Sequence, residues 1–416
     1  MQKFGTDGIR GIYKSTLFEE DAYALGYALS LFGKRLVVAR DTRVSGERLK
    51  RALALGFSYL GGEVFDGGIL PTPALFFGVK ALDADFGVEI TASHNPPEYN
   101  GLKVFSREGK PSRDFLNLVE EKMKKVPENR NLSSLHPINL AEGYINFLLE
   151  KCGNLKGLKI ALDTANGACS PIAGKVFEKL GAEVVLLSNK GDGNLINQNC
   201  GALFPQSLQK AVVENNCHFG FAFDGDGDRV IGVTQKGELF DGDSILFALG
   251  KAIKEKGLLC GNAVVATKVS SFALEEKLNE EGITLFYSEV GDSAVAEEMK
   301  NRNLILGGEK AGHILLDEGT GDGLKIALAL SQLLKSGFDL ESCLLPTYPR
   351  FEKNLPLSAT LSTPLFYKKV EKVKDILKGK GKIIVRPSGT EPLLRILIET
   401  KDEALLSQAV KILGRC

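Results

Sequence analysis

Three aspartates stand at alternate positions in the stretch Asp224-Gly-Asp-Gly-Asp-Arg229. The apolar runs at 219–223 and 230–233 on either side of it are typical of strands. The two glycines allow the backbone to curl, so that the carboxylates of Asp224, Asp226 and Asp228 can face one point. Such closely spaced carboxylates repel one another unless a cation lies between them, and ligation by oxygen alone favours a hard ion. The stretch therefore predicts a Mg²⁺ site.

Two other structures were weighed against that metal site. A calcium-binding EF-hand loop has glycine at its sixth position and glutamate at its twelfth, where this chain has Arg229 and Gln235. An EF-hand is also flanked by helices rather than strands, so it is rejected. A plain hairpin turn remains an alternative, because Asp-Gly is a favoured turn pair.

Ser93 is the candidate nucleophile. It follows the apolar run 86–90 and precedes an Asn-Pro-Pro sequence, which prevents continuation as a helix and stiffens the loop. His94 could move a proton or hold a phosphate, and Lys103 follows shortly after. No G-x-S-x-G pattern surrounds Ser93, which disfavours an acyl-transfer hydrolase. A Ser-Asn-Pro turn with a solvent-facing lysine is the plain alternative.

Two further polar stretches suit a phosphorylated sugar. The first offers a guanidinium, two hydroxyls and backbone N–H groups around a glycine, which together suit a phosphate. Its groups are Arg386, Ser388, Gly389 and Thr390, with Arg395 as a second positive charge. The second is a polar cluster whose carboxylate can accept hydrogen bonds from sugar hydroxyls. It consists of Glu309, Lys310 and His313. A plain turn and a solvated loop are the alternatives.

The glycine-rich N-terminal stretch 4–11 contains Arg10 and fits neither of two common nucleotide-binding patterns. It is not a P-loop, because G-x-x-x-x-G-K-[ST] is absent. Nor does G-x-G-x-x-G follow a predicted strand, which argues against a dinucleotide site.

One unit of strand, helix, glycine stop and strand occurs three times, and this order predicts parallel strands. The first strands lie at 36–41, 158–163 and 263–266. The helices lie at 49–60, 172–180 and 272–278, and the closing strands at 63–65, 183–187 and 284–286. A further strand in each unit, at 86–90, 219–223 and 304–308, leads into one of the polar loops. Open α/β sheets bind ligands at the carboxyl ends of their strands, so three loops are expected in one shared cleft.

The last part of the chain predicts a smaller domain of mixed type. Helices are expected at 367–377 and 403–413, and strands at 382–385 and 394–399. The expected fold class is α/β, with three related α/β domains of mixed, mostly parallel sheets and a smaller α+β C-terminal domain around a central cleft. The predicted boundaries are 1–152 for the serine loop, 153–250 for the metal loop, 251–346 for the sugar loop and 347–416 for the phosphate loop.

Composition excludes several classes of protein. The chain has 416 residues, 44% hydrophobic and 25% charged, which suits a soluble globular protein of two to four domains. Its net charge is zero, so nothing favours a nucleic-acid partner. No apolar run approaches the roughly 18 residues of a membrane span, and no signal peptide is visible. Seven cysteines without C-x-x-C pairing indicate reduced thiols. A cytoplasmic protein without a membrane partner is expected.

Together, a metal site, a serine, a phosphate-binding loop and a hydroxyl-binding cluster suit phosphoryl transfer on a phosphorylated polyol. With these features, the sequence resembles the α-D-phosphohexomutase family over its whole length. The likeness is carried by Thr91-Ala-Ser-His-Asn-Pro96, Asp224-Gly-Asp-Gly-Asp-Arg229, Gly308-Glu-Lys-Ala-Gly-His313 and Arg386-Pro-Ser-Gly-Thr390. The stretches 4–11 and 194–201 resemble those of bacterial members that act on glucosamine phosphates.

The resemblance implies an isomerase with an enzyme phosphoserine at Ser93 and one Mg²⁺ held by Ser93, Asp224, Asp226 and Asp228. Ser93 would exchange its phosphoryl group with a sugar phosphate through a hexose 1,6-bisphosphate, which also serves as activator. Glucosamine 6-phosphate and glucosamine 1-phosphate would interconvert, in amino sugar metabolism that supplies cell-wall precursors. The family's charge-neutralising and proton-moving groups correspond to Arg10, His94, Lys103, Arg229 and His313. Its substrate-binding groups correspond to Glu309, Lys310, Arg386, Ser388, Gly389, Thr390 and Arg395.

The sequence departs from the family pattern at Ala311, usually serine, and at Ser293, arginine in many relatives. The segment 97–101 is more similar to members that act on mannose and glucose phosphates. Such a phosphomannomutase/phosphoglucomutase activity is the alternative within the family. A non-enzymatic protein that binds a cation or a sugar phosphate is the alternative outside it. Small-molecule sugar phosphates are the expected partners, and a homodimer is possible.

Overall fold

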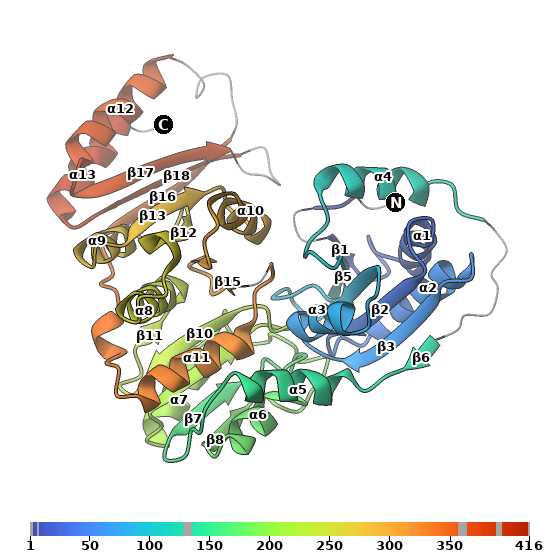
Figure 1. Cartoon of the computed structure of the whole chain (residues 1–416). Helices are drawn as coiled ribbons and strands as arrows, with labels where there is room; N and C mark the ends of the chain where they lie inside the picture. Colours follow the sequence, from blue (N-terminus) through green and yellow to red (C-terminus); the bar gives the residue numbers. More distant parts are fainter. Residues whose placement is uncertain are drawn as a thin grey trace.

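A computed structural model describes residues 3–5, 8–127, 135–317, 319–356, 364–387 and 393–414. These residues form four sheets, each with its own helices. Figure 1 shows these four units following one another along a curved path, with the first and the fourth at its two ends. The predicted class, three related α/β units and a smaller α+β unit, is confirmed.

The first three sheets share one strand order. In the first sheet, β2 (Arg35–Arg40) pairs in parallel with β3 (Glu63–Ile69) on one side and with β4 (Phe86–Ile90) on the other. An antiparallel strand, β5 (Tyr99–Phe105), then follows β4. β1 (Ile9–Ile12) and β6 (Leu135–Pro137) extend this sheet at its edges.

The second and third sheets repeat this arrangement. The parallel strands of the second are β8 (Glu183–Leu187), β7 (Lys159–Asp163) and β9 (Phe219–Phe223), followed by antiparallel β10 (Val230–Thr234) and β11 (Leu239–Phe240). Those of the third are β13 (Thr284–Ser288), β12 (Ala263–Thr267) and β14 (Leu306–Gly308), followed by antiparallel β15 (Ile314–Leu316). The predicted parallel pairing is confirmed in all three units. Each polar loop proves to connect an antiparallel pair.

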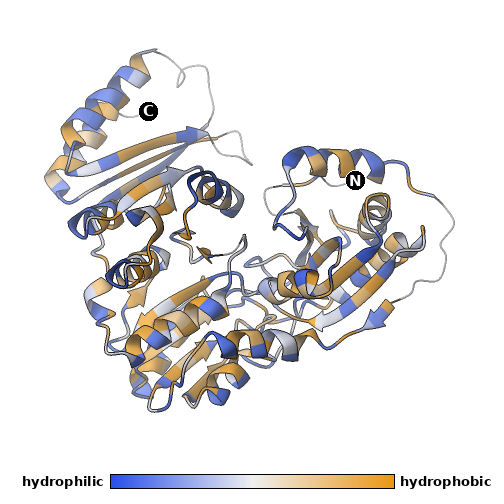
Figure 2. Cartoon of the chain, viewed as in Figure 1, coloured by the Kyte–Doolittle hydropathy of each residue, from blue (hydrophilic) through white to orange (hydrophobic). Residues whose placement is uncertain are grey.

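Continuous apolar sequence explains the inner strands. All five residues of β4, β9 and β12 are buried, because these strands carry neighbours on both edges and helices on their faces. In Figure 2 the strands are mostly hydrophobic, whereas the helices combine hydrophobic and hydrophilic residues. The helices that precede the second sheet are α1 (Glu19–Ser30), α2 (Gly46–Ser58), α3 (Thr72–Ala81), α4 (Arg113–Met123) and α5 (Leu140–Glu150). Those that follow are α6 (Ala173–Lys179), α7 (Gln206–Glu214), α8 (Gly242–Glu255), α9 (Phe272–Glu280), α10 (Asp292–Arg302) and α11 (Gly323–Lys335).

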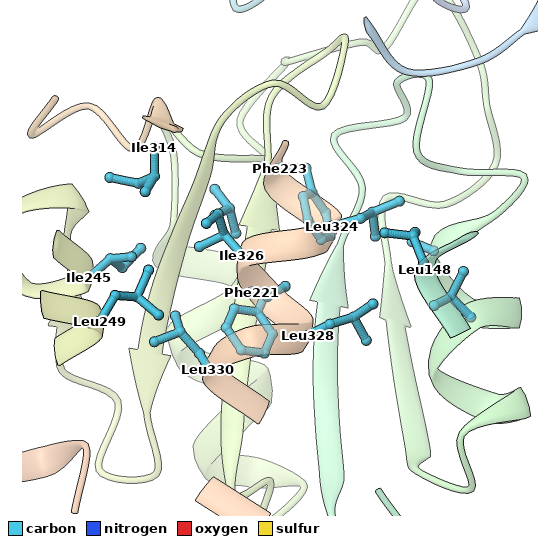
Figure 3. Close-up of a cluster of buried hydrophobic side chains, with 14 of the residues drawn as sticks. Leu148, Phe221, Phe223, Ile245, Leu249, Ile314, Leu324, Ile326, Leu328 and Leu330 are labelled. Carbon is cyan, nitrogen blue, oxygen red and sulfur yellow. The ribbon is translucent and has the colours of Figure 1, made fainter. Parts of the chain in front are cut away.

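One apolar core joins the first three units. It contains buried side chains from all three, including Val37, Phe221 and Leu306. Figure 3 shows leucines and an isoleucine of α11 packed beside Phe221 and Phe223 of β9, so a late helix covers the second sheet. This shared core fixes the three polar loops relative to one another.

The fourth unit has a core of its own. This unit contains the antiparallel strands β16 (Arg350–Pro356), β18 (Leu393–Thr400) and β17 (Gly381–Pro387), with α12 (Pro364–Leu377) and α13 (Glu403–Leu413). Sequence analysis missed β16. Its exposed and partly buried residues alternate along an edge strand, so it lacks the apolar run from which β17 and β18 were predicted.

Candidate active site

Ser93 lies just beyond the carboxyl end of β4, in a left-handed backbone conformation with φ of 51°. Its N–H donates to Thr91 Oγ1 at 2.9 Å, which stabilises the tight turn. Its hydroxyl is buried and donates to Asp224 Oδ2 at 2.6 Å. The structure therefore brings the predicted nucleophile to the predicted acidic loop, across 131 residues of sequence.

The acidic loop connects β9 to β10, so it is both a hairpin connection and a cluster of acids. One carboxylate oxygen from each of Asp224, Asp226 and Asp228 lies within 4.8 Å of the others, and all three residues are buried. Burial, and then repulsion by Asp226 and Asp228, raises the pKa of Asp224 well above its usual value. Within the described chain, the buried Asp226 Oδ1 accepts no hydrogen bond. This donor set fits a divalent cation, which would satisfy that oxygen and relieve the repulsion.

Lys103 of β5 points its ammonium into the same acidic loop. Its Nζ lies 2.5 Å from Asp226 Oδ2 and 2.7 Å from Asp228 Oδ2, and the side chain is buried. Thr72, at the start of α3, donates from Oγ1 to Asp226 Oδ2 at 2.7 Å. Lys103 is thus a buried partner of the acids rather than a solvent-facing lysine.

His313, from the loop between β14 and β15, lies against the third acid. Its Nδ1 is 3.6 Å from Asp228 Oδ1, and its Nε2 is 3.6 Å from Asp292 Oδ2. Burial by itself would lower the pKa of His313, but the carboxylates of Asp228 and Asp292 together outweigh burial and raise that pKa. Conversely, burial would raise the pKa of Asp228, whereas Lys103 and then His313 hold it well below its usual value.

His94 faces the serine, with its Nδ1 3.3 Å from Ser93 Oγ. Burial, followed by the charges of Arg229 and Arg10, lowers the pKa of His94 to about 4. The imidazole is therefore neutral at physiological pH. Arg10 donates to Asn95 Oδ1 at 3.2 Å, and Arg229 Nε lies 4.0 Å from both Asp224 and Asp228. Arg10, Arg229 and His94 thus surround the serine and the acids.

The sugar-loop residues lie beside this cluster, because Val230 N donates to Gly312 O at 3.0 Å. Glu309 accepts from Gly291 N through Oε1 at 3.0 Å and stays partly exposed. Lys310 Nζ lies 3.6 Å from Asp241, the residue that caps α8. Its assignment to substrate stays a prediction.

The fourth unit supplies two arginines. Arg386 and Arg395 are cross-strand partners on β17 and β18. Burial and then the charge of Arg395 lower the pKa of Arg386, an effect opposed by Glu289 of the third unit. Two neighbouring guanidiniums suit an anion. Ser388, Gly389 and Thr390 lie outside the described residues.

Comparison with known proteins accounts for the whole chain. It matches phosphoglucomutase/phosphomannomutase alpha/beta/alpha domains I, II and III over residues 1–130, 142–237 and 241–351, and the C-terminal domain over 353–412. It is 40% identical over 436 aligned residues to the phosphoglucosamine mutase of Thermoanaerobacter sp. (strain X514), covering 99% of this chain and 97% of that protein. The chain belongs to the α-D-phosphohexomutase family. The resemblance found in the sequence is confirmed, and the chain is an enzyme of the isomerase class.

Further members of the phosphohexomutase family are similar to this chain in sequence or in fold. The phosphoglucosamine mutase of Carboxydothermus hydrogenoformans is also 40% identical, with 98% of this chain and 97% of that protein covered. A phosphoglucomutase/phosphomannomutase family protein of Burkholderia thailandensis has a TM-score of 0.82 at 26% identity, covering 97% and 94% of the two chains. Aspergillus fumigatus N-acetylphosphoglucosamine mutase, solved with GlcNAc-6P and magnesium, shares the fold at 14% identity and a TM-score of 0.64, covering 99% and 95%.

Sequence analysis missed three residues that touch this site, Arg43, Thr72 and Asn197. Arg43 follows β2 at its carboxyl end, the same edge from which the predicted loops extend. The position of Arg43 after a predicted strand could therefore have identified it as a residue near the site. Thr72 follows β3 at the same spacing, so it had the same signal, and Asn197 lies in the stretch 194–201, whose resemblance was noted without a role for this residue.

Proposed function

We propose that the chain interconverts glucosamine 6-phosphate and glucosamine 1-phosphate through a phosphoserine at Ser93. One observation carries the proposal. The Ser93 hydroxyl lies 2.6 Å from Asp224, inside a buried cluster of three aspartates and the basic side chains that face them. The 40% identical relatives from Thermoanaerobacter and Carboxydothermus, both phosphoglucosamine mutases, support the choice of sugar.

Each transfer exchanges one phosphorus–oxygen bond for another. A sugar hydroxyl oxygen bonds to the phosphorus of phosphorylated Ser93, the bond from phosphorus to Ser93 Oγ breaks, and the hydroxyl proton leaves to a base or water. The resulting 1,6-bisphosphate turns round, and Ser93 Oγ bonds to the other phosphorus. The bond from that phosphorus to the sugar oxygen breaks, and the sugar oxygen takes up a proton. The sugar keeps the phosphate it received, so the net change is isomerisation.

The chain's own residues position and neutralise the reacting groups. Asp224, Asp226, Asp228 and Ser93 would hold Mg²⁺, which would neutralise charge on the phosphoryl group. Lys103 and Arg229 offset the acids, and Arg10 adds positive charge near Asn95. Neutral His94 can hydrogen-bond the serine oxygen or its phosphate.

Substrate phosphate would bind Arg386, Ser388, Gly389, Thr390 and Arg395, and sugar hydroxyls would bind Glu309. Mg²⁺ as the resident ion, a hexose 1,6-bisphosphate activator, a cytoplasmic location and a homodimer belong to the same proposal. The domain boundaries at 152, 250 and 346 also stay predictions. No helix within the described segments is long and apolar enough to cross a membrane.

The first experiment replaces the nucleophile. Ser93→Ala should reduce mutase turnover at least about 10⁴-fold, because no other hydroxyl occupies that position, while the melting temperature stays near wild type. A coupled assay with glucosamine phosphate and glucose 1,6-bisphosphate measures turnover, and intact mass with peptide mapping measures phosphate on Ser93. Near-normal turnover in the variant would remove the mechanism. A wild-type protein that neither turns over nor carries phosphate on Ser93 would favour a binding protein.

A second candidate within the family is phosphomannomutase/phosphoglucomutase activity, because the segment 97–101 is more similar to such members, and Ala311 and Ser293 depart from the usual pattern. Ala311 and Ser293 are both exposed in the structure. Comparison of kcat/KM for glucosamine, glucose and mannose phosphates separates the two. A higher kcat/KM for mannose phosphate would favour the second candidate.

A further inference from the structure

Arg43 is fully buried beneath the serine loop, and the proposed chemistry does not use it. Its Nε donates to Asp41 Oδ2 at 2.9 Å. One terminal nitrogen donates to the carbonyl oxygens of Pro96 and of Tyr99, the latter at 2.9 Å. The other donates to the carbonyl oxygens of Ser93 at 3.0 Å and Asn95 at 2.7 Å. All five N–H groups of the guanidinium are therefore engaged, four of them by the loop that carries the serine.

Asn197, from the second unit, reaches the same loop from another side. Its Nδ2 donates to the carbonyl oxygen of Ser93 at 2.8 Å and to that of Asn95 at 3.0 Å. The residue is buried, and its own N–H donates to Ala165 O at 3.0 Å. Its backbone is left-handed, with φ of 59°, a conformation that asparagine tolerates well.

One terminal nitrogen of Arg43 and Nδ2 of Asn197 thus each donate to the same two carbonyl oxygens. Each of the carbonyl oxygens of Ser93 and Asn95 accepts one bond from Arg43 and one from Asn197, so both lone pairs of each oxygen are used. Ser93 needs such support because a left-handed conformation is unfavourable for a residue with a side chain. With its carbonyl held on one side, its hydroxyl points to Asp224 on the other.

We propose that Arg43 and Asn197 are positioning residues that hold Ser93 for phosphoryl transfer. This inference rests on the proposed function, in which Ser93 Oγ gives up and regains a phosphoryl group in each turnover. In-line transfer is sensitive to misplacement of the reacting oxygen by even about 1 Å. A clamp built from two units keeps the serine aligned with the acidic loop, which belongs to the second unit.

Asn197→Asp tests the clamp with little change of shape. It keeps the size and the tolerance for a left-handed backbone, but it replaces the two N–H donors with an oxygen that repels both carbonyls. We expect kcat to fall at least about 30-fold, while KM for glucosamine phosphate stays within about twofold. Asn197→Gly, which keeps the backbone free and removes the donors, should lower kcat by about tenfold. Asn199→Asp and Asn199→Gly are matched controls, because Asn199 is exposed and also left-handed, with φ of 51°.

The step itself is measured by the single-turnover rate at which phosphorylated Ser93 loses its phosphoryl group to sugar phosphate. Wild-type rates in both Asn197 variants would overturn the proposal, and so would equal losses in the Asn199 controls. Arg43→Lys keeps a charge beside Asp41 but loses the two terminal guanidinium nitrogens that donate to the loop carbonyls. The kcat of this variant should also fall. Combined with Asn197→Asp it should lose less than the product of the two single effects, because both residues hold the same carbonyls.

Failure of the clamp is distinct from failure of the proposed function. If wild type does not turn over glucosamine phosphates, the proposed function fails, and the clamp is then measured by the rate at which Ser93 takes phosphate from glucose 1,6-bisphosphate. A slower rate in Asn197→Asp than in Asn199→Asp would support the clamp, and equal rates would overturn it.

Discussion

The buried ammonium of Lys103 lies between two carboxylates, those of Asp226 and Asp228. A lysine buried without such partners would be driven towards its neutral form. Asp226 shares one oxygen between Lys103 and Thr72, and its other oxygen is the one that accepts no hydrogen bond within the described chain. The two oxygens therefore have separate tasks, one holding the lysine and one available to a cation.

Asp226→Asn should weaken the metal site for this reason. The amide removes one negative charge from the cluster and one ligand oxygen, so the Mg²⁺ concentration for half-maximal activity should rise at least about tenfold, and kcat should fall. Activity measured against Mg²⁺ after treatment with EDTA gives both values. Asp192→Asn, an exposed aspartate of the same unit, is the control. If Asp226→Asn matched wild type in both values, the metal assignment would be wrong.

His94 gives the protein a pH-dependent stability. An unfolded chain binds a proton on this histidine near pH 6.5, whereas the folded protein binds it only near pH 4. Between these values the unfolded state holds more protons, so the free energy of unfolding should fall as the pH falls from 6.5 to 4. The contribution of this one residue is at most about 3 kcal/mol.

His94→Gln should therefore lose about 1–3 kcal/mol less stability than wild type between pH 6.5 and pH 4. Urea denaturation at several pH values measures the difference. His136→Gln, at an exposed histidine, is the control and should follow wild type. Parallel curves for wild type and His94→Gln would contradict the assignment of a depressed pKa.

At the level of helices and strands, α5 is tied to α11 by one buried pair. The Tyr144 hydroxyl lies 2.8 Å from both carboxylate oxygens of Asp322, the residue that caps α11 through Lys325 N. α11 in turn covers β9 (Figure 3). This hydrogen bond therefore joins a helix that precedes the second sheet to one that follows the third.

Tyr144→Phe should lower the free energy of unfolding by about 1–2 kcal/mol, because a buried carboxylate loses a donor while the ring still packs against Phe77 and Phe147. Urea denaturation measures this loss. Tyr367→Phe, whose side chain is half exposed, should change stability by less than about 0.5 kcal/mol. Equal stability of Tyr144→Phe and wild type would show that the pair contributes nothing.

Much of the fold could be predicted because buried parallel strands require continuous apolar sequence, as at β4, β9 and β12. The residue types of the acidic loop and of the serine loop were equally visible. The clamp was not, because Arg43 and Asn197 lie 50 and 104 residues from Ser93, and no local pattern encodes such a pairing. β16 was missed because it is an edge strand in which exposed and partly buried residues alternate and no apolar run occurs.

Across the whole molecule, the first and third units meet at Lys110 and Asp292. Lys110, beyond the end of β5, pairs with Asp292 at the start of α10, and both side chains are largely buried. Asp292 also faces His313 Nε2 at 3.6 Å. A second pair between the same units, Lys300 with Glu108, is 83% and 87% exposed at a distance of 3.9 Å. The two ion pairs therefore differ in burial, and the exposed pair is also the longer one.

Lys110→Met should loosen the contact between the two units, because it leaves the Asp292 carboxylate largely buried without this cation. Amide hydrogen exchange around 106–110 and 291–295 should become at least about fivefold faster. Lys300→Met is the matched control and should leave these rates unchanged, since exposed pairs contribute little. Equal exchange in the two variants would argue against a structural role for the Lys110 pair.

The distance along the chain between Ser93 and its partners has a consequence for biosynthesis. The ribosome makes Ser93 more than 100 residues before Asn197 and Asp224. Since domains fold largely in order as they emerge, the first unit alone lacks the amide and the acids that align its serine. A nascent chain should therefore become able to accept phosphate only after the second unit has been translated and has docked.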